Sequence, residues 1–302
     1  MSESSADLRH TIANASELAG VVRTMKTMAA ASIGQYEQAT HALDDYYRSV
    51  QLGLLACLSE VEVAPDVVLE NGVTGVLVFG SDQGLVGQFN EVMGDFVTAK
   101  LAALPGKKVL WVVGERMQAN LQMSLNINIQ MSEQQGGVTL QAGFNLPASI
   151  HAITPLLTQI LHQIVALRER GGMSQVLVFH HRPEPGAIYA PVMQRLLPFD
   201  QQWRREILAL HWPGRQRPQV IGGAPATMPQ LMHEHLFVSL FRACVQSLAS
   251  ENASRLAAMQ RAEKNIRELL IQLNHAFHSV RQNSIDAELF DVIAGFAALK
   301  QQ

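Results

Sequence analysis

The feature that most constrains this chain is an uninterrupted helical segment in its last quarter. Residues 230–294 contain neither Gly nor Pro, the two residues that most often end a helix. Apolar residues also recur every seven positions, at Met259, Ile266, Leu273 and Val280. We therefore predict one continuous helix of about 65 residues, which at 1.5 Å per residue reaches roughly 100 Å. Such a length is typical of a shaft, lever or spacer rather than of a catalytic domain.

The first 64 residues carry a second helical seam. They contain no Pro, and alternating steps of three and four select the apolar residues Leu8, Ile12, Ala15, Ala19, Val22, Ala29, Ile33, Tyr36, Leu43, Tyr47, Val50 and Leu54. Lys26 and Thr40 are polar interruptions of this seam. In the closing helix, the position complementary to the seven-residue repeat is expected at Leu256, Ala262, Leu269 and Ala276. Two such seams at opposite ends of one chain predict an antiparallel coiled coil with a left-handed supercoil.

The middle of the chain alternates between strand and helix patterns. Short apolar runs predict buried parallel strands at Val73–Phe79, Lys108–Val113, Gln175–Phe179 and Glu206–Leu210. Helical spacing predicts helices at Glu91–Leu104 and Ala148–Arg170. The expected fold is therefore α/β: a doubly wound, Rossmann-like domain inserted between two coiled-coil helices. The predicted boundaries are residues 1–64 and 228–302 for the helices and 65–227 for the inserted domain.

Composition excludes several classes of function. The net charge of −3, without a long basic block, argues against nucleic-acid binding through phosphate neutralisation. Two cysteines, Cys57 and Cys244, are too few for a disulfide framework and suggest a reducing compartment. The first residues, which include Glu3 and Asp7, lack a signal-peptide pattern, and no run of 18 apolar residues predicts a membrane span.

A Gly-rich turn follows the first predicted strand, at residues 80–90. Backbone amides in such a turn can bind phosphate, which is one interpretation of Gly80, Gly84 and Gly87. However, the G-x3-G-x2-G spacing is not the dinucleotide fingerprint, and a P-loop would need Lys followed by Ser or Thr. A structural strand-to-helix turn, with Ser81 or Asp82 as a cap or turn acceptor, is the favoured interpretation.

The histidines do not predict a metal site. They cluster at His180-His181, at His233 with His235, and at His275 with His278, but none stands in the H-E-x-x-H arrangement of zinc proteases. We interpret them as solvated surface residues. No Ser or Cys lies in a nucleophile elbow, so we expect no catalytic residue, no metal and no cofactor.

Four segments of the chain together resemble the γ subunit of F-type ATP synthases. Residues 81–90 (SDQGLVGQFN) resemble the family signature S-D-x-G-L-x-G-x-x-N, and residues 21–31 (VVRTMKTMAAA) resemble its I-T-K-A-M-x-M-V-A-A run. Residues 251–259 (ENASRLAAM) are similar to E-x-A-x-R-x-x-A-M, and residues 281–295 to R-Q-x-x-I-T-x-E-L-x-E-I-x-x-G. Departures at residues 20–22, Ser32 and Asp286 suggest a divergent bacterial branch of the family.

The resemblance implies a central-stalk rotor that couples ion flow to ATP synthesis or hydrolysis. In that family the coiled coil fills the axis of a ring of α and β subunits, and the α/β domain lies on the membrane c ring beside ε. The implied partners are therefore the α, β and ε subunits and the c ring. The implied location is peripheral, at the cytoplasmic face of the bacterial inner membrane. The rotor itself is non-catalytic and acts by favouring different conformations of otherwise equivalent sites.

The resemblance also assigns residues that contact the α/β ring. In the first helix these are Arg23 and Met25. In the closing helix they are Glu251, Arg255, Arg281, Gln282 and Glu288. The forked donors of an Arg guanidinium suit carboxylate or carbonyl partners, which favours Arg255 and Arg281. For each residue, the alternative is an ordinary solvated helix position.

Two other classes of function remain open from sequence. A non-rotating coiled-coil adaptor that carries an α/β module would have equally long helices. A phosphosugar or nucleotide enzyme would use the Gly80–Gly87 turn. Nucleotide binding by the isolated chain would favour the enzyme, and we expect none.

Overall fold

A computed structural model describes residues 4–60, 72–125, 137–170, 172–216 and 218–299, with side chains described to residue 293. The chain divides into two compact units. The α/β unit comprises Ala30–Ser254, and the two-helix unit contains α1 up to Ala29 and α6 from Arg255. Helices α1 (Ser5–Glu60) and α6 (Ala224–Leu299) each run through both units.

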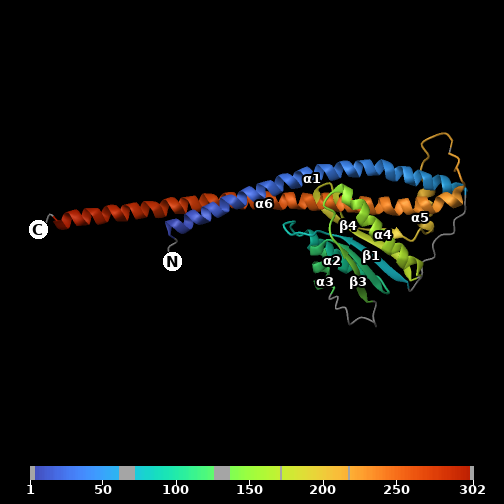
Figure 1. Cartoon of the computed structure of the whole chain (residues 1–302), viewed down its shortest axis with the longest axis horizontal. Helices are drawn as coiled ribbons and strands as arrows, with labels where there is room; N and C mark the ends of the chain where they lie inside the picture. The colour runs from blue at the N-terminus through green and yellow to red at the C-terminus, as the bar shows by residue number, and fades with distance from the viewer. Residues whose placement is uncertain (1–3, 61–71, 126–136, 171, 217, 300–302) are drawn as a thin grey trace. The chain divides into compact units, whose positions relative to one another are not determined.

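A five-stranded sheet forms the centre of the α/β unit (Figure 1). Its strands are β1 (Val73–Phe79), β2 (Lys108–Val113), β3 (Val138–Phe144), β4 (Met173–Glu184) and β5 (Ala187–Leu197), in the order β3-β2-β1-β4-β5. The first four are parallel, and β5 pairs antiparallel with β4 through a turn in which Gly186 has a φ of +87°. β1 lies in the middle of this order, which explains its continuous run of buried apolar residues.

Helices cover both faces of the sheet. Val76 and Val78 of β1 pack with α2 (Phe89–Ala102) and α3 (Glu115–Ser124) on one face. Leu77 and Phe79, which alternate with them, pack on the other face with α4 (Ile153–Glu169) and the first part of α6. A short 3-10 helix, η1 (Ile150–Ala152), precedes α4. The first part of α6 is therefore one of the helices that cover the sheet of the α/β unit, and not only a helix of a coiled coil.

One further cluster completes the α/β unit. The end of α1 packs through Val50, Leu54 and Leu58 against α5 (Gln201–Leu208) and the start of α6.

By length and hydropathy alone, the segment Ile150–Glu169 could cross a membrane. In the structure five of its apolar residues are buried, namely Ile153, Leu157, Ile160, Leu161 and Ile164, so its apolar character is that of a core helix.

The structure confirms the α/β fold with long terminal helices and corrects several elements. The predicted strands at β1, β2 and β4 and the helices at α2 and α4 are present. The predicted strand Glu206–Leu210 is wrong, because these residues mostly belong to α5. Asp200 caps that helix by accepting from Trp203 N at 2.9 Å, and Trp203 and Ile207, four residues apart, face the core. Strands β3 and β5 and helix α3 were not predicted.

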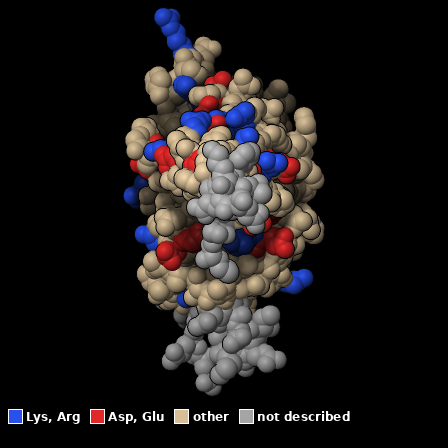
Figure 2. Space-filling model, turned by 90° about the vertical axis from the view of Figure 1, so that its left-hand side faces the viewer, with Lys and Arg blue, Asp and Glu red and all other residues tan. Residues whose placement is uncertain are grey.

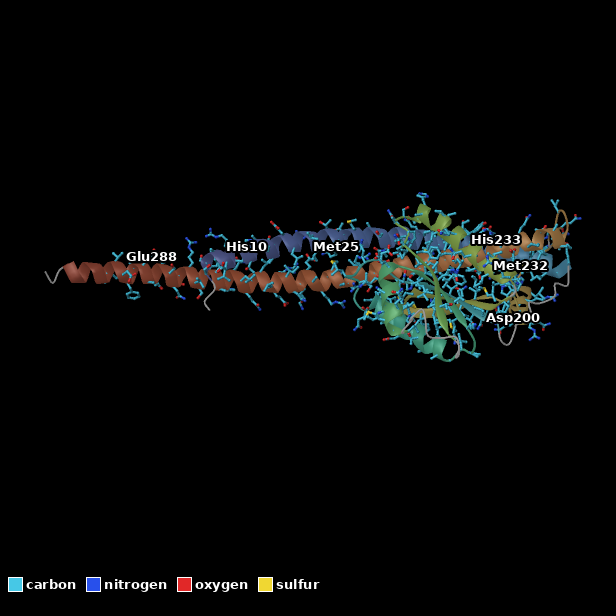
Figure 3. All side chains as sticks on the ribbon, turned by 60° about the horizontal axis from the view of Figure 1, so that its bottom comes forward. His10, Met25, Asp200, Met232, His233 and Glu288 are labelled. Atoms are coloured by element: carbon cyan, nitrogen blue, oxygen red, sulfur yellow. The ribbon has the colours of Figure 1, made fainter. Side chains whose placement is uncertain are left out.

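The two helices of the two-helix unit pair antiparallel, side by side in Figures 1 and 3. Near the start of α1, the Arg9 guanidinium lies 5.6 Å from the centre of the Phe277 ring. Further along α1, Lys26 donates to Glu263, which precedes Phe277 on α6, so the two helices run in opposite directions. Along the whole of α1, every seventh residue of the predicted seam is buried or half-buried. These residues are Leu8, Ala15, Val22, Ala29, Tyr36, Leu43 and Val50.

In α6 the seven-residue repeat is confirmed, but the complementary position is shifted. Met259 and Ile266 are buried, and Leu273 and Val280 are half-buried. Leu269 and Ala276 are exposed, so their assignment to the seam is wrong. Leu270 and Phe277, one residue later, are half-buried instead. Apolar identity alone does not separate Leu269 from Leu270.

The closing helix also begins earlier than predicted. It starts at Ala224 and has 76 residues, so Pro229 lies inside it rather than in its first turn. Pro225 occupies the second helical position, where a missing N–H costs no intrahelical hydrogen bond.

Candidate interaction site

The Gly-rich turn after β1 is held by hydrogen bonds between its own ends. Ser81 N donates to Asn90 Oδ1 at 3.0 Å, and Asn90 Nδ2 donates to Ser81 Oγ at 2.8 Å. The Ser81 hydroxyl donates in turn to Gln83 O at 2.9 Å. Ser81 and Asn90 are both buried. These groups therefore satisfy one another inside the protein.

Asp82 connects the turn to two other segments. Its Oδ1 accepts from Glu115 N at 3.0 Å, at the first residue of α3, and its Oδ2 accepts from Leu146 N at 2.9 Å, just after β3. The N-cap residue Gly114 has no side chain to satisfy these donors. A carboxylate is also favourable at a helix N-terminus. Asp82 thus fixes three segments at the carboxyl edge of the sheet.

The middle of the turn has a left-handed backbone. Leu85 has a φ of +62° and Gly87 a φ of +60°. At Gly84, by contrast, there is room for a side chain, because an added Cβ would meet no atom within 4 Å. The Leu85 side chain is 62% exposed, so burial of that side chain does not offset its strained backbone. Val86, between Leu85 and Gly87, is buried, and its carbonyl oxygen accepts a hydrogen bond from the Ser254 hydroxyl of α6.

The end of the turn packs on a buried histidine of β4. His181 Nε2 lies 2.9 Å from Phe89 O, and because a carbonyl only accepts, Nε2 carries the proton. The His181 ring packs against the Phe89 and Tyr189 rings at centroid distances of 4.2 and 4.4 Å. Burial lowers the pKa of His181 to about 4, although its backbone hydrogen bonds act in the opposite direction.

The interpretation of the histidines as surface residues is wrong at three positions. His180, His181 and His235 are all buried, and burial lowers the pKa of His180 and of His235 to about 4 as well. From the sequence we expected solvated surface histidines. His180 and His181 instead belong to β4, which pairs with β5, a strand that was not predicted. Among the described residues, no group of three or more His, Cys, Asp or Glu side chains is arranged to hold a metal ion.

An ion pair interrupts the apolar seam of the two-helix unit. Lys26 Nζ lies 2.6 Å from Glu263 Oε2, and Arg23 Nε and an Arg267 guanidinium nitrogen lie 3.9 and 3.6 Å from Glu263 Oε1. The hydrogen bond from Lys26 lowers the pKa of the Glu263 carboxyl. Val22, Met25, Met259 and Ile266 surround the pair with apolar contacts. Sequence analysis noted Lys26 as an interruption but missed Glu263 as its partner.

The predicted ring-contact residues differ in how accessible they are. Arg23 is exposed, and Met25 is half-buried beside the seam. Glu251 is buried within the α/β unit, and Arg255 is half-buried at the start of the two-helix unit's part of α6. Arg281, Gln282 and Glu288 are exposed, and Glu288 lies on the part of α6 that extends past the start of α1 (Figure 3). The seven residues are therefore spread along the helices and do not form one cluster.

The end of α6 also exposes apolar side chains that sequence analysis did not select. Ile285, Leu289, Phe290, Val292 and Ile293 are each more than half exposed. Ile285, Leu289 and Val292 recur at helical spacing, a pattern typical of a helix face that packs against a partner. The signal in the sequence is that apolar residues continue to recur after Val280, where the seam with α1 ends.

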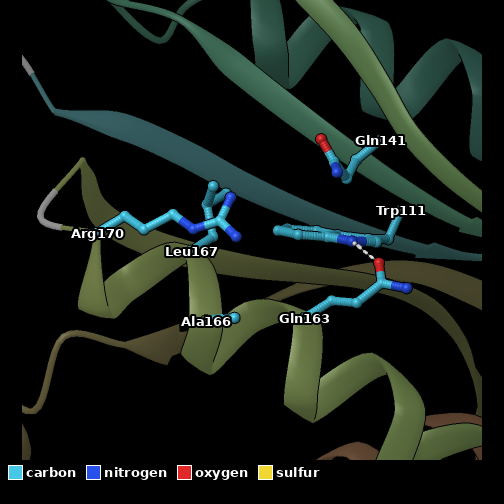
Figure 4. A pocket seen from close by; sticks show the side chains of 6 residues that line it. All are labelled: Trp111, Gln141, Gln163, Ala166, Leu167 and Arg170. Atoms are coloured by element: carbon cyan, nitrogen blue, oxygen red, sulfur yellow. Dashed lines mark hydrogen bonds between the residues drawn. The ribbon is translucent and has the colours of Figure 1, made fainter.

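The charge on one face and the size of two cavities bear on the nucleotide-binding alternative. Figure 2 shows Lys and Arg interspersed with Asp and Glu on the described part of one face, without a large area of one sign. A cavity of about 120 Å³ lies beside Trp111, whose Nε1 donates to Gln163 Oε1 at 2.8 Å, with Gln141, Leu167 and Arg170 around it (Figure 4). This volume is well below the roughly 300 Å³ of the smallest ligand pockets. A second cavity of about 360 Å³, lined by Tyr47, Arg48 and Arg242 among others, lies away from the Gly-rich turn and is within that range.

Comparison with known proteins places these features in one family. A family model described as ATP synthase matches residues 4–299. The ATP synthase gamma chain of Brucella canis is 24% identical over 305 residues, which cover 97% of this chain and 98% of that protein. The gamma chain of Nitratidesulfovibrio vulgaris is 26% identical over 306 residues, with the same coverage of 97% and 98%.

Solved structures share the fold. In the cryo-EM structure of Euglena gracilis mitochondrial ATP synthase that contains OSCP, F1 and c-ring, one chain superposes with a TM-score of 0.68 at 15% identity, covering 98% of this chain and 94% of that chain. The rotor structure from the same organism gives 0.62 at 13% identity, covering 93% and 98%. The near-complete family match, the paired helices and the inserted sheet agree: the chain belongs to the ATP synthase gamma-chain family.

Proposed function

We propose that this chain, as the γ subunit of an F-type ATP synthase, is the central shaft that couples ion flow to ATP synthesis or hydrolysis by rotation. The observation that carries the proposal is the last part of α6, from Arg281 onward. It combines exposed apolar residues, among them Leu289 and Phe290, with the exposed polar residues Arg281, Gln282 and Glu288. A long helix with these side chains suits the axis of a ring of partner subunits.

The chain acts through shape and contributes no catalytic residue. Its partners are the α and β subunits around the shaft, with ε and the c ring at the α/β unit. It works at the cytoplasmic face of the bacterial inner membrane as a peripheral subunit. Arg23, Met25 and Arg255 contribute to contacts with the ring, whereas Glu251, which is buried, contributes by supporting its neighbours on α6. The relatives named above favour this function over the adaptor alternative.

Assembly with candidate partners tests the proposal. The chain is co-expressed with α and β subunits from the same genome and purified through a tag on β. We expect one copy of this chain per three β subunits. An α and β complex that forms without this chain, or with a variable amount of it, would contradict the proposal.

The contribution of the exposed end of α6 is tested separately. The double variant Arg281→Ala and Gln282→Ala is expected to retain the fold, because both side chains are exposed. Ion pumping per ATP hydrolysed by the assembled complex is expected to fall. The matched control is Arg261→Ala with Gln272→Ala, two exposed positions elsewhere on α6. Equal coupling in both variants would remove Arg281 and Gln282 from the site.

A further inference from the structure

The Gly-rich turn after β1, residues 80–90, which we call the signature turn, is hydrogen-bonded directly to α6. The hydroxyl of Ser254 donates to the carbonyl oxygen of Val86, and both residues are buried. Ser254 is also the last residue of α6 that belongs to the α/β unit. The bond is therefore the final polar contact that this unit makes with α6 among the described hydrogen bonds.

The backbone conformation of the two flanking residues orients the Val86 carbonyl. Leu85 and Gly87, on either side of Val86, both have left-handed conformations. A left-handed Leu costs about 1 to 2 kcal/mol, and such strain persists only where the surrounding structure imposes it. The turn is anchored at one end by Ser81 and Asn90 and at the other by the Phe89 and His181 contact. The direction of the Val86 carbonyl is thus fixed from both sides.

A second polar contact joins the sheet to α6. His180 Nε2 of β4 lies 3.0 Å from Gln246 Oε1. Gln246 and Ser254 are separated by eight positions, which is about two helical turns or roughly 12 Å along the axis. Two contacts at this separation oppose both rotation and sliding of α6 on the sheet.

Polar contacts also join α6 to two neighbouring helices of the unit. Arg242 pairs with Asp44 of α1, Glu234 accepts from Tyr46 of α1, and Trp203 of α5 donates to His235.

Leu240, Cys244 and Leu248 of α6 pack on the sheet and α4. Apolar burial is non-directional, so a small rotation of the helix costs little of it, whereas a hydrogen bond weakens steeply when its angle changes. The contacts of Gln246 and Ser254 therefore add directional restraint where α6 packs on the sheet and on the turn after β1.

We infer that Ser254 is a positioning residue that latches α6 to the α/β unit, so that torque passes between them without slip. This inference rests on the proposed rotor function, because torque between the two parts arises only in a rotating shaft. The latch is a fixed contact that is retained throughout the rotary cycle.

The latch is tested first in the full chain alone. Spin labels are attached after Ile188→Cys on β5 and His233→Cys on α6, two exposed positions of the α/β unit, whereas the native Cys57 and Cys244 are buried. With Ser254→Ala, the variance of the label distance is expected to increase up to about twofold, since one of the two contacts that Gln246 and Ser254 make with the sheet and the turn is lost. Ser254→Thr, which keeps the hydroxyl, is expected to restore the narrow distribution.

Ser250→Ala is the matched control. Ser250 is buried one turn earlier on α6, and its hydroxyl has no hydrogen-bond partner among the described residues. This variant is expected to leave the distance distribution unchanged. Equal distributions for Ser254→Ala and wild type, or equal broadening by Ser250→Ala, would overturn the latch.

The second test uses the assembled complex. With Ser254→Ala, ATP hydrolysis is expected to continue while fewer ions are pumped per ATP, and Ser254→Thr is expected to restore the ratio. A wild-type complex that hydrolyses ATP without pumping would contradict the proposed function, while the distance measurement would still decide whether the latch exists. A wild-type complex that pumps, with an unchanged ratio in Ser254→Ala, would overturn the latch alone.

Discussion

Lys26 of α1 and Glu263 of α6 lie opposite each other within the apolar seam, with Nζ and Oε2 2.6 Å apart. Each is a polar residue in a seam whose neighbouring positions, among them Val22, Met259 and Ile266, are apolar. A shift of one helix along the other would place each charge against apolar side chains, which is costly. The pair therefore specifies the register of the antiparallel helices, as single polar residues do in other coiled coils.

Exchange of the two charges tests this role. Lys26→Glu alone and Glu263→Lys alone are each expected to lower the thermal stability of the chain, because each puts like charges side by side. The double variant is expected to recover part of the loss, because the exchanged pair is again of opposite charge while Arg23 and Arg267 remain beside position 263. Thermal unfolding followed by circular dichroism measures all four proteins. Additive losses in the double variant would show that the two residues do not act as a pair.

The seam itself is tested by a charge at a buried position. Ile266→Asp is expected to destabilise the two-helix unit by about 3 kcal/mol or more, because it buries a carboxylate without a partner. Ile271→Asp is the matched control, since Ile271 is 55% exposed on the same helix and should change stability by less than about 0.5 kcal/mol. Similar unfolding midpoints for the two variants would contradict the pairing of α1 with α6.

Close packing at the start of the signature turn predicts a contrast between two glycines. A Cβ at Gly80 would lie 2.2 Å from Met117 Cβ, whereas at Gly84 there is nothing within 4 Å. Gly80→Ala is therefore expected to cost about 3 kcal/mol through overpacking, and Gly84→Ala much less. Chemical denaturation of both variants provides the measurement. A stable Gly80→Ala protein would mean that β1 and α3 are not so closely packed.

The buried histidines predict a loss of stability in mild acid. The pKa of His181 is lowered from 6.5 to about 4 in the folded chain, so between these values the unfolded chain binds more protons. Its contribution is present above pH 6.5 and is lost as the pH falls toward 4. His181→Asn is expected to flatten the dependence of unfolding free energy on pH, whereas His275→Asn, at an exposed position of α6, is not. Equal slopes would contradict the burial of His181.

The long helices and the central strands follow from periodicity in the sequence. Repeats of seven need only apolar identity and spacing, and β1 and β2 are buried on both faces, so their sequences are continuously apolar. The fold class was predictable for that reason. The strand β3 was missed because its residues alternate between half-buried and exposed, which leaves polar residues and a glycine within it.

The finer features depend on contacts between segments far apart in sequence. Glu263 joins the seam only because Lys26 lies opposite, and Asp82 serves α3 rather than the helix that follows its own turn. The latch of Ser254 on Val86 links residues 168 positions apart. Four matched segments together indicated the family, and the structure supplies the physical reason for three polar residues of the signature turn, Ser81, Asp82 and Asn90.

Rotation of a probe on this chain tests the central claim most directly. The complex with α and β subunits is fixed to a surface through β, and a bead is attached after Ile188→Cys, at an exposed position of the α/β unit. The account predicts that the bead turns continuously in one direction when ATP is added and stops when ATP is removed. ATP hydrolysis by the complex with a stationary bead would contradict it.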